Sequence, residues 1–219
     1  MVARGNPERI SLASLRSRGD AGAHAVPVLE PPLVKPGDHP EFFRFPAPEG
    51  RSRESTLRLD ASGRFWHEGA RVEHAGLSAA LHSWIARHPD DGRYILTNGY
   101  DWTYFTVDDA PYFVRAVRID AERVTLVLSD GTEETWEPEA TRIGEGDALY
   151  ASVKRGAPGG PFEAKFTTHA QASLAPALVL VEGGESPGTP AQGGECGETA
   201  GTPALRLGGR VVPIGRHRT

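Results

Sequence analysis

Seven prolines between residues 27 and 48 limit what this part of the 219-residue chain can form. Each proline fixes φ and removes a backbone donor, so neither a long helix nor a central strand can pass through the run. The seven are Pro27, Pro31, Pro32, Pro36, Pro40, Pro46 and Pro48. We therefore predict that residues 1–55 form a proline-rich extended arm. Phe42, Phe43 and Phe45 either pack on the folded domain as a strap or form a partly exposed cluster, since aromatic surface is costly to leave in water.

A second unusual segment lies near the other end of the chain. From Gly183 to Ala204 there is no bulky apolar residue, so burial cannot repay an ordering cost of about 1–2 kcal/mol per residue. We interpret residues 182–204 as a Gly/Pro-rich linker and residues 205–219 as a short, hairpin-like basic tail. A hairpin is marginal alone in water, so this one either docks on the main sheet or is not stably formed.

What remains, residues 56–181, is predicted to be a single β-rich domain of the α+β class. Strands are expected at 57–59, 64–67, 94–97, 102–107, 112–119, 124–128, 132–136, 150–154, 162–166 and 177–181. Gly63 is expected to supply the positive φ of the first turn. A helix is expected from Gly76 to His88, because its apolar residues form one stripe and Pro89 disfavours its continuation. A second, short helix is expected before Pro176.

The composition of the chain limits the cellular location and the kinds of binding partner that we expect. A formal net charge of −5 gives no general attraction to nucleic acid or to an anionic membrane. The single cysteine, Cys196, excludes an intrachain disulfide framework and a cysteine-rich zinc site. We find no apolar stretch of the roughly 20 residues that a membrane span requires. The sequence therefore predicts a cytoplasmic protein without a cofactor and without nucleic-acid or membrane binding.

The middle segment resembles a known family over about residues 56–181. The motifs are Gly63-Arg64-Phe65-Trp66-His67-Glu68-Gly69, Tyr94-Ile95-Leu96-Thr97, Val107-Asp108-Asp109-Ala110-Pro111-Tyr112 and Phe162-Glu163-Ala164-Lys165-Phe166. They resemble the bacterial domain of unknown function 1285 family. The arm, the insert Asn98-Gly99-Tyr100-Asp101 and the tail after Glu182 depart from its pattern. The resemblance implies curled antiparallel sheets with accompanying helices and internal repetition, and a small-ligand-binding, regulatory role without an established reaction.

The residues that could bind a metal ion or take part in catalysis are better explained by structural roles. His67, Glu68 and His74 have the spacing His-Glu-x5-His, which does not place two ligands on one helix face, so we predict no metal site. Ser78 lies in Gly76-Leu77-Ser78-Ala79-Ala80, which lacks the final glycine of a nucleophile elbow. Asp108 and Asp109 are neighbours on an extended chain and should point apart. We therefore predict no catalytic residue.

The strand from Tyr100 to Val107 is the strongest candidate binding element. Its alternation places Tyr100, Trp102, Tyr104 and Thr106 on one face, and Thr103, Phe105 and Val107 on the other. Both faces are apolar, which predicts a pocket wall, a partner surface or a face that the helix or the arm covers. The predicted ligand-binding residues are Trp66, His67, Tyr100, Trp102, Tyr104, Asp108 and Tyr112.

These observations favour a non-enzymatic module with a regulatory or signalling role. It would bind an unidentified small molecule or protein on the aromatic strand surface, and we also consider a homodimer. One alternative is a hydrolase-type enzyme that uses His67 with an acidic partner, either Asp108 or Glu163. Another is an adaptor that binds its partners through the two tails.

Overall fold

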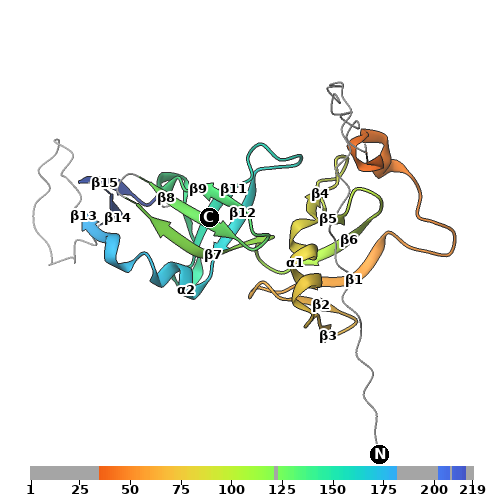
Figure 1. The fold of residues 1–219 in the computed structure, drawn as a ribbon, viewed down its shortest axis with the longest axis horizontal. Coiled ribbons are helices and arrows are strands. Elements are labelled where there is room, and N and C mark those ends of the chain that lie inside the picture. Colours follow the sequence, from red (N-terminus) through yellow and green to blue (C-terminus); the bar gives the residue numbers. More distant parts are fainter. Residues whose placement is uncertain (1–34, 121–122, 182–201, 208, 216–219) are drawn as a thin grey trace, which may run out of the picture. The chain divides into compact units, whose positions relative to one another are not determined.

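The computed structural model describes residues 35–120, 123–181, 202–207 and 209–215, all of which belong to one compact unit, Val34–Thr219. The predictions for residues 1–34 and for residues 182–201 of the linker, with Cys196, lie outside the described residues, whereas residues 202–204, also assigned to the linker, form the start of a strand. Within the described part the fold is mainly β with two α-helices, which confirms the predicted class (Figure 1). None of the described helices is long and apolar enough to cross a membrane.

The first sheet is built from the first six strands. They are β1 (Glu54–Leu59), β2 (Phe65–His67), β3 (Ala70–Arg71), β4 (Ile85–Arg87), β5 (Tyr94–Thr97) and β6 (Trp102–Val107), in the order β3-β2-β1-β6-β5-β4. Helix α1 (Ala75–Ser83) connects β3 to β4. Two short 3₁₀ helices, η1 (Pro36–Asp38) and η2 (Pro40–Arg44), precede this sheet.

The second sheet is built from the next six strands. They are β7 (Tyr112–Ile119), β8 (Val124–Leu128), β9 (Glu133–Thr135), β10 (Arg142–Ile143), β11 (Leu149–Val153) and β12 (Phe162–Phe166). The 3₁₀ helices η3 (Pro138–Ala140) and η4 (Glu145–Asp147) lie between β9 and β11. Helix α2 (Thr168–Ala172) and the 3₁₀ helix η5 (Ala175–Ala177) then lead to a three-stranded sheet of β13 (Leu178–Val181), β14 (Thr202–Leu207) and β15 (Arg210–Pro213).

The two six-stranded sheets share one strand order. The second sheet runs β10-β11-β12-β7-β8-β9. Its first strand in sequence, β7, takes the place of β1, its second strand, β8, takes the place of β2, and so on, so the two orders are the same when one sheet is read from its opposite edge. Each is made of two antiparallel three-stranded meanders joined by a central parallel pair, β1 with β6 and β7 with β12. This agrees with the internal repetition that the family resemblance implies. The resemblance implies antiparallel sheets, and all described strand pairs are antiparallel except these two central pairs.

The predicted helix from Gly76 to His88 is too long at its end. Helix α1 ends at Ser83, and Ile85–Arg87 forms β4, which pairs antiparallel with β5. The stripe that suggested a continuous helix is not uniformly buried, since Leu77 is 45% exposed. Backbone groups of β5 offer ladder hydrogen bonds to a β-branched residue such as Ile85, and this tertiary partner outweighs the local helical pattern.

Both six-stranded sheets contribute to one hydrophobic core. Leu59 and Phe65 come from the first sheet, and Phe113 and Leu126 come from the second. At the β1–β2 turn Gly63 has φ +76°, as predicted, and an added Cβ would lie 2.8 Å from the Phe113 ring. Glycine is therefore required there twice, for the turn and for the close approach of β7.

The structure decides between the alternatives that the sequence left open at both flanks. Phe42 on η2 is buried and packs with Ile95 and Trp102, so the segment from 35 to 45 forms a strap on the first sheet. Near the other end, β14 and β15 form a hairpin that extends β13, and Leu205 is completely buried in the main core. The hairpin is therefore docked.

Candidate functional site

The aromatic strand β6 has one buried aromatic residue on each face, whereas Thr106 is exposed. Phe105 enters the main core, while Trp102 is only 6% exposed and packs against Phe43 of the strap and His88. Tyr104 lies 5.2 Å from Trp102 between ring centroids, and its hydroxyl donates to Asp91. Of the alternatives considered for this surface, the structure favours coverage by the arm.

The predicted ligand-binding residues do not converge on one place. Trp66 donates its indole N–H to Asp60 and lies beside Arg58, which in turn pairs with Asp108. Tyr100 is 53% exposed in the turn before β6. Tyr112, at the start of β7, is nearly fully buried and donates its hydroxyl to the Ile85 carbonyl.

The structure separates His67 from the acidic groups considered for a hydrolase. His67 lines a hollow with Leu57, whereas Asp108 pairs with Arg58, the neighbour of Leu57 on β1. Successive residues of a strand face opposite sides, so His67 and Asp108 lie on opposite faces of the sheet. Glu163 belongs to β12 and is paired with Arg142. Among the described residues no group of three or more histidine, cysteine or acidic side chains could hold a metal ion.

Asp108 and Asp109 point apart, as predicted, and each carboxylate serves a different sheet. Asp108 binds Arg58 of β1 in the first sheet. Asp109 accepts from Lys165 of β12 at 2.6 Å and from the Tyr150 hydroxyl of β11 at 3.1 Å in the second sheet. These contacts fix the connector between β6 and β7, so the acidic pair is explained by structure.

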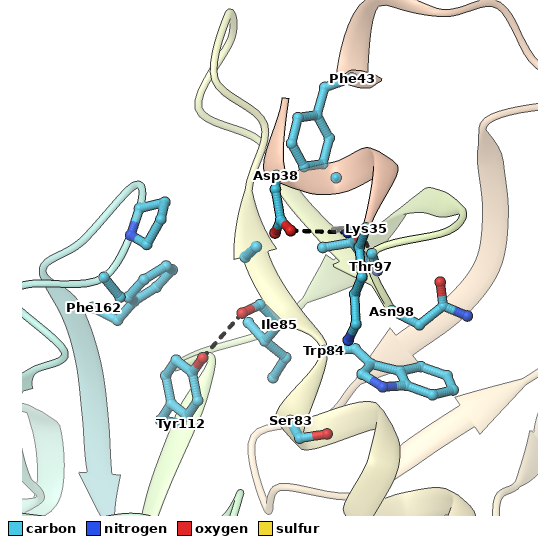
Figure 2. Close-up of a pocket in the computed structure, with 15 residues that line it drawn as sticks. Lys35, Asp38, Phe43, Ser83, Trp84, Ile85, Thr97, Asn98, Tyr112 and Phe162 are labelled. Atoms are coloured by element: carbon cyan, nitrogen blue, oxygen red, sulfur yellow. Dashed lines mark hydrogen bonds between the residues drawn. The ribbon is translucent and has the colours of Figure 1, made fainter. Parts of the chain in front are cut away.

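A cleft of about 490 Å³ lies beside β6 rather than on it (Figure 2). The strap, the end of α1, β4, the β5–β6 turn, the start of β7 and the loop before β12 all contribute to it. Its lining residues are Lys35, Gly37, Asp38, Phe43, Ser83, Trp84, Ile85, Ala86, Thr97, Asn98, Gly99, Tyr112, Ala157, Pro158 and Phe162. Of the predicted site residues, only Tyr112 is among them.

One wall of the cleft is aromatic and rigid. The rings of Tyr112 and Phe162 meet edge to face at 5.4 Å, and both residues are nearly fully buried. Burial raises the pKa of the Tyr112 hydroxyl well above its usual value, and nearby Asp130 and Glu134 raise it further. Its hydroxyl already donates a hydrogen bond to the Ile85 carbonyl, so Tyr112 contributes an uncharged aromatic ring to the cleft.

The opposite side of the cleft is polar. Asp38 accepts a hydrogen bond from the Lys35 backbone N–H at 2.9 Å. The Asn98 side-chain oxygen accepts from the backbone N–H groups of Tyr100 and Asp101. Gly99, at φ +86°, allows the Lys35 side chain to lie against this turn, because an added Cβ would come within 2.5 Å of Lys35 Cδ. The turn that departs from the family pattern therefore shapes the cleft.

Most of the residues that line the cleft were not predicted from the sequence. Lys35 and Asp38 lie in the proline-rich arm, which was predicted to be extended, and Ile85 lies where a helix was expected. Phe162 was placed on a strand without a role. The Asn-Gly pair at 98–99 was the one available signal, since it marks a tight turn beside the aromatic strand.

Comparison with known proteins supports the fold. No family model matches the sequence, and no curated protein matches it. A solved DUF1285 family protein from Silicibacter pomeroyi DSS-3 is similar with a TM-score of 0.51 and 15% identity, over 79% of this chain and 92% of that chain. Another, from Shewanella baltica OS155, gives a TM-score of 0.45 and 16% identity over 57% and 94%. The chain therefore has the fold of the DUF1285 protein from Silicibacter pomeroyi, which agrees with the resemblance found in the sequence.

Proposed function

We propose that the protein is a non-enzymatic module that binds a small ligand in the cleft beside β6. The observation that carries this proposal is the cleft itself, which has about 490 Å³ and one aromatic wall facing a polar side. Ligand sites are typically concave, largely apolar and equipped with a few placed polar groups. The predicted aromatic surface on β6 is replaced as the site, because the strap covers Trp102.

The contacts around the cleft support a binding role over a catalytic one. Tyr112 is held by Ile85, and the Ser83 hydroxyl donates to the Ala80 carbonyl. No described histidine or cysteine lines the cleft, so it lacks the usual nucleophile–base pair. The strap closes part of the cleft, which would let an occupied site change the state of the arm and thus supports a regulatory role.

A thermal-shift screen with a metabolite library tests the proposal. A ligand that binds only the folded protein stabilises it by about 2.7 kcal/mol at about 100 times its Kd. Ala157→Trp, which fills the cleft from the loop before β12, should abolish the shift. Ala61→Trp, in an exposed turn outside the cleft, is the matched control and should keep it. Stabilisation that survives Ala157→Trp would place the ligand elsewhere and refute the proposal.

A further inference from the structure

The charges at the cleft point to a ligand class, and this inference rests on the proposed function. Lys35 and Asp38 both line the cleft, and neither forms an ion pair with any residue that the structure describes. Figure 2 shows the side chain of Lys35, the residue before η1, extending toward Trp84, while the Asp38 carboxylate is turned away from that ammonium. The cleft thus presents one separate cation and one separate anion.

Other charged groups near the cleft are already occupied. The Arg87 guanidinium lies over the rings of Tyr94 and Phe162, and it donates to the Tyr94 hydroxyl and the Gly92 carbonyl. The Lys35 Nζ lies 5.9 Å from the Tyr100 ring centroid, at the limit of a cation–π contact. Lys35 and Asp38 are therefore the charges available to a ligand.

The Asn98 side chain adds a third polar group to this side of the cleft. The Asn98 oxygen is used by two backbone N–H groups, whereas its amide nitrogen makes no hydrogen bond to a described residue. A free amide N–H₂ and an ammonium on the same side of the cleft both suit a carboxylate. The Asp38 carboxylate suits an ammonium.

We infer that the ligand is an amino acid with an apolar or aromatic side chain. Its carboxylate would face Lys35 and Asn98, its ammonium would face Asp38, and its side chain would lie against Ile85, Tyr112 and Phe162. A ligand with both charged groups can pair with Lys35 and with Asp38, which are exposed, whereas a ligand with one charged group gains only one of these two contacts. The volume of about 490 Å³ is sufficient for one aromatic amino acid.

Three related probes, measured by isothermal titration calorimetry, test the contributions of the ligand carboxylate and the ligand ammonium separately. L-tryptophan carries both charged groups, tryptamine lacks the carboxylate, and indole-3-propionate lacks the ammonium. Lys35→Met keeps the aliphatic stem and should weaken L-tryptophan and indole-3-propionate about tenfold while leaving tryptamine unchanged. Asp38→Asn keeps an oxygen for the Lys35 N–H and should weaken L-tryptophan and tryptamine about tenfold while leaving indole-3-propionate unchanged.

The outcomes distinguish this inference from the proposed function. Binding of the probes that Ala157→Trp abolishes, with equal effects of both charge variants on all three, would keep the cleft as a site but overturn the amino-acid assignment. Failure of all three probes to bind the folded protein would also overturn the assignment, while the library screen decides the proposed function separately. Binding that Ala157→Trp leaves intact would overturn both.

Discussion

Mild acid should destabilise the fold through the buried imidazole of His82. This residue, near the end of α1, is 1% exposed, its ring lies 4.9 Å from the Phe65 ring, and its Nε2 lies 3.4 Å from Arg115 Nη2. Burial is the main cause that lowers the pKa of His82 from 6.5 to about 4, and the Arg115 charge lowers it further. The Gly63 backbone and the charge of Asp130 act in the opposite direction, whereas the buried Nδ1 of His82 has no hydrogen-bond partner among the described residues.

The sign of the effect follows from which state binds the proton better. The pKa is lower in the folded state, so the unfolded chain binds the proton more tightly, and stability falls as the pH decreases from about 6.5 to about 4. At about 1.4 kcal/mol per pH unit, the two pKa values imply a full loss of about 3 kcal/mol. About 2 kcal/mol of this should already be lost near pH 5.

Urea unfolding at about pH 7.5 and about pH 5 measures this loss. The control is His82→Leu, which removes the titrating group and whose two free energies of unfolding are compared with each other. Carboxylates such as Glu54, Asp60 and Asp130 have lowered pKa values and stay ionised at the lower pH, so they contribute little. If wild type and His82→Leu lose the same free energy between the two pH values, the assignment to His82 is wrong.

Three further substitutions test the packing. Gly63→Ala should cost about 2–4 kcal/mol, because the backbone has φ +76° and the new Cβ meets the Phe113 ring; chemical denaturation with an unchanged midpoint would contradict this. Asp130→Asn should cost about 3 kcal/mol, since it removes the carboxylate that lies 2.7 Å from the mostly buried Lys154 ammonium and leaves Glu134, at 3.9 Å, as the remaining carboxylate; a loss within about 0.5 kcal/mol of zero would show that Glu134 or water replaces it. Phe42→Ala should cost about 3 kcal/mol and shift tryptophan emission to longer wavelength as the strap releases Trp102, whereas an unchanged spectrum would mean that the strap holds without it.

Regular extended segments were the most predictable part of the fold. The strands at 94–97, 102–107, 112–119, 124–128 and 162–166 have the predicted bounds. Their signals are local, because β-branched and aromatic residues alternate between turns that contain glycine, proline or aspartate. The opposite orientations of Asp108 and Asp109 follow from the same two-residue period.

Pairing between distant segments was less predictable. Each parallel central pair joins the first and the last strand of its sheet in sequence, and the local pattern does not distinguish a parallel neighbour from an antiparallel one. The end of α1 was predicted wrongly for a related reason. The strand β5 pairs with Ile85–Arg87, and the stripe of apolar residues does not reveal this partner. The residues that line the candidate cleft were hard to predict, since they come from five separate segments of the chain.

The sequence by itself determined the strand character of β6, its two apolar faces and the glycine turn at Gly63, because each depends on backbone geometry within a few residues. Tertiary structure alone decided that Phe43 covers Trp102, and that Lys35 and Phe162 line one cleft. These contacts join residues far apart in the chain, and their free energy exists only after the sheets have formed and the strap has lost its conformational freedom. The aromatic strand was correctly recognised as unusual, but the cleft beside it depends on what the rest of the chain packs around it.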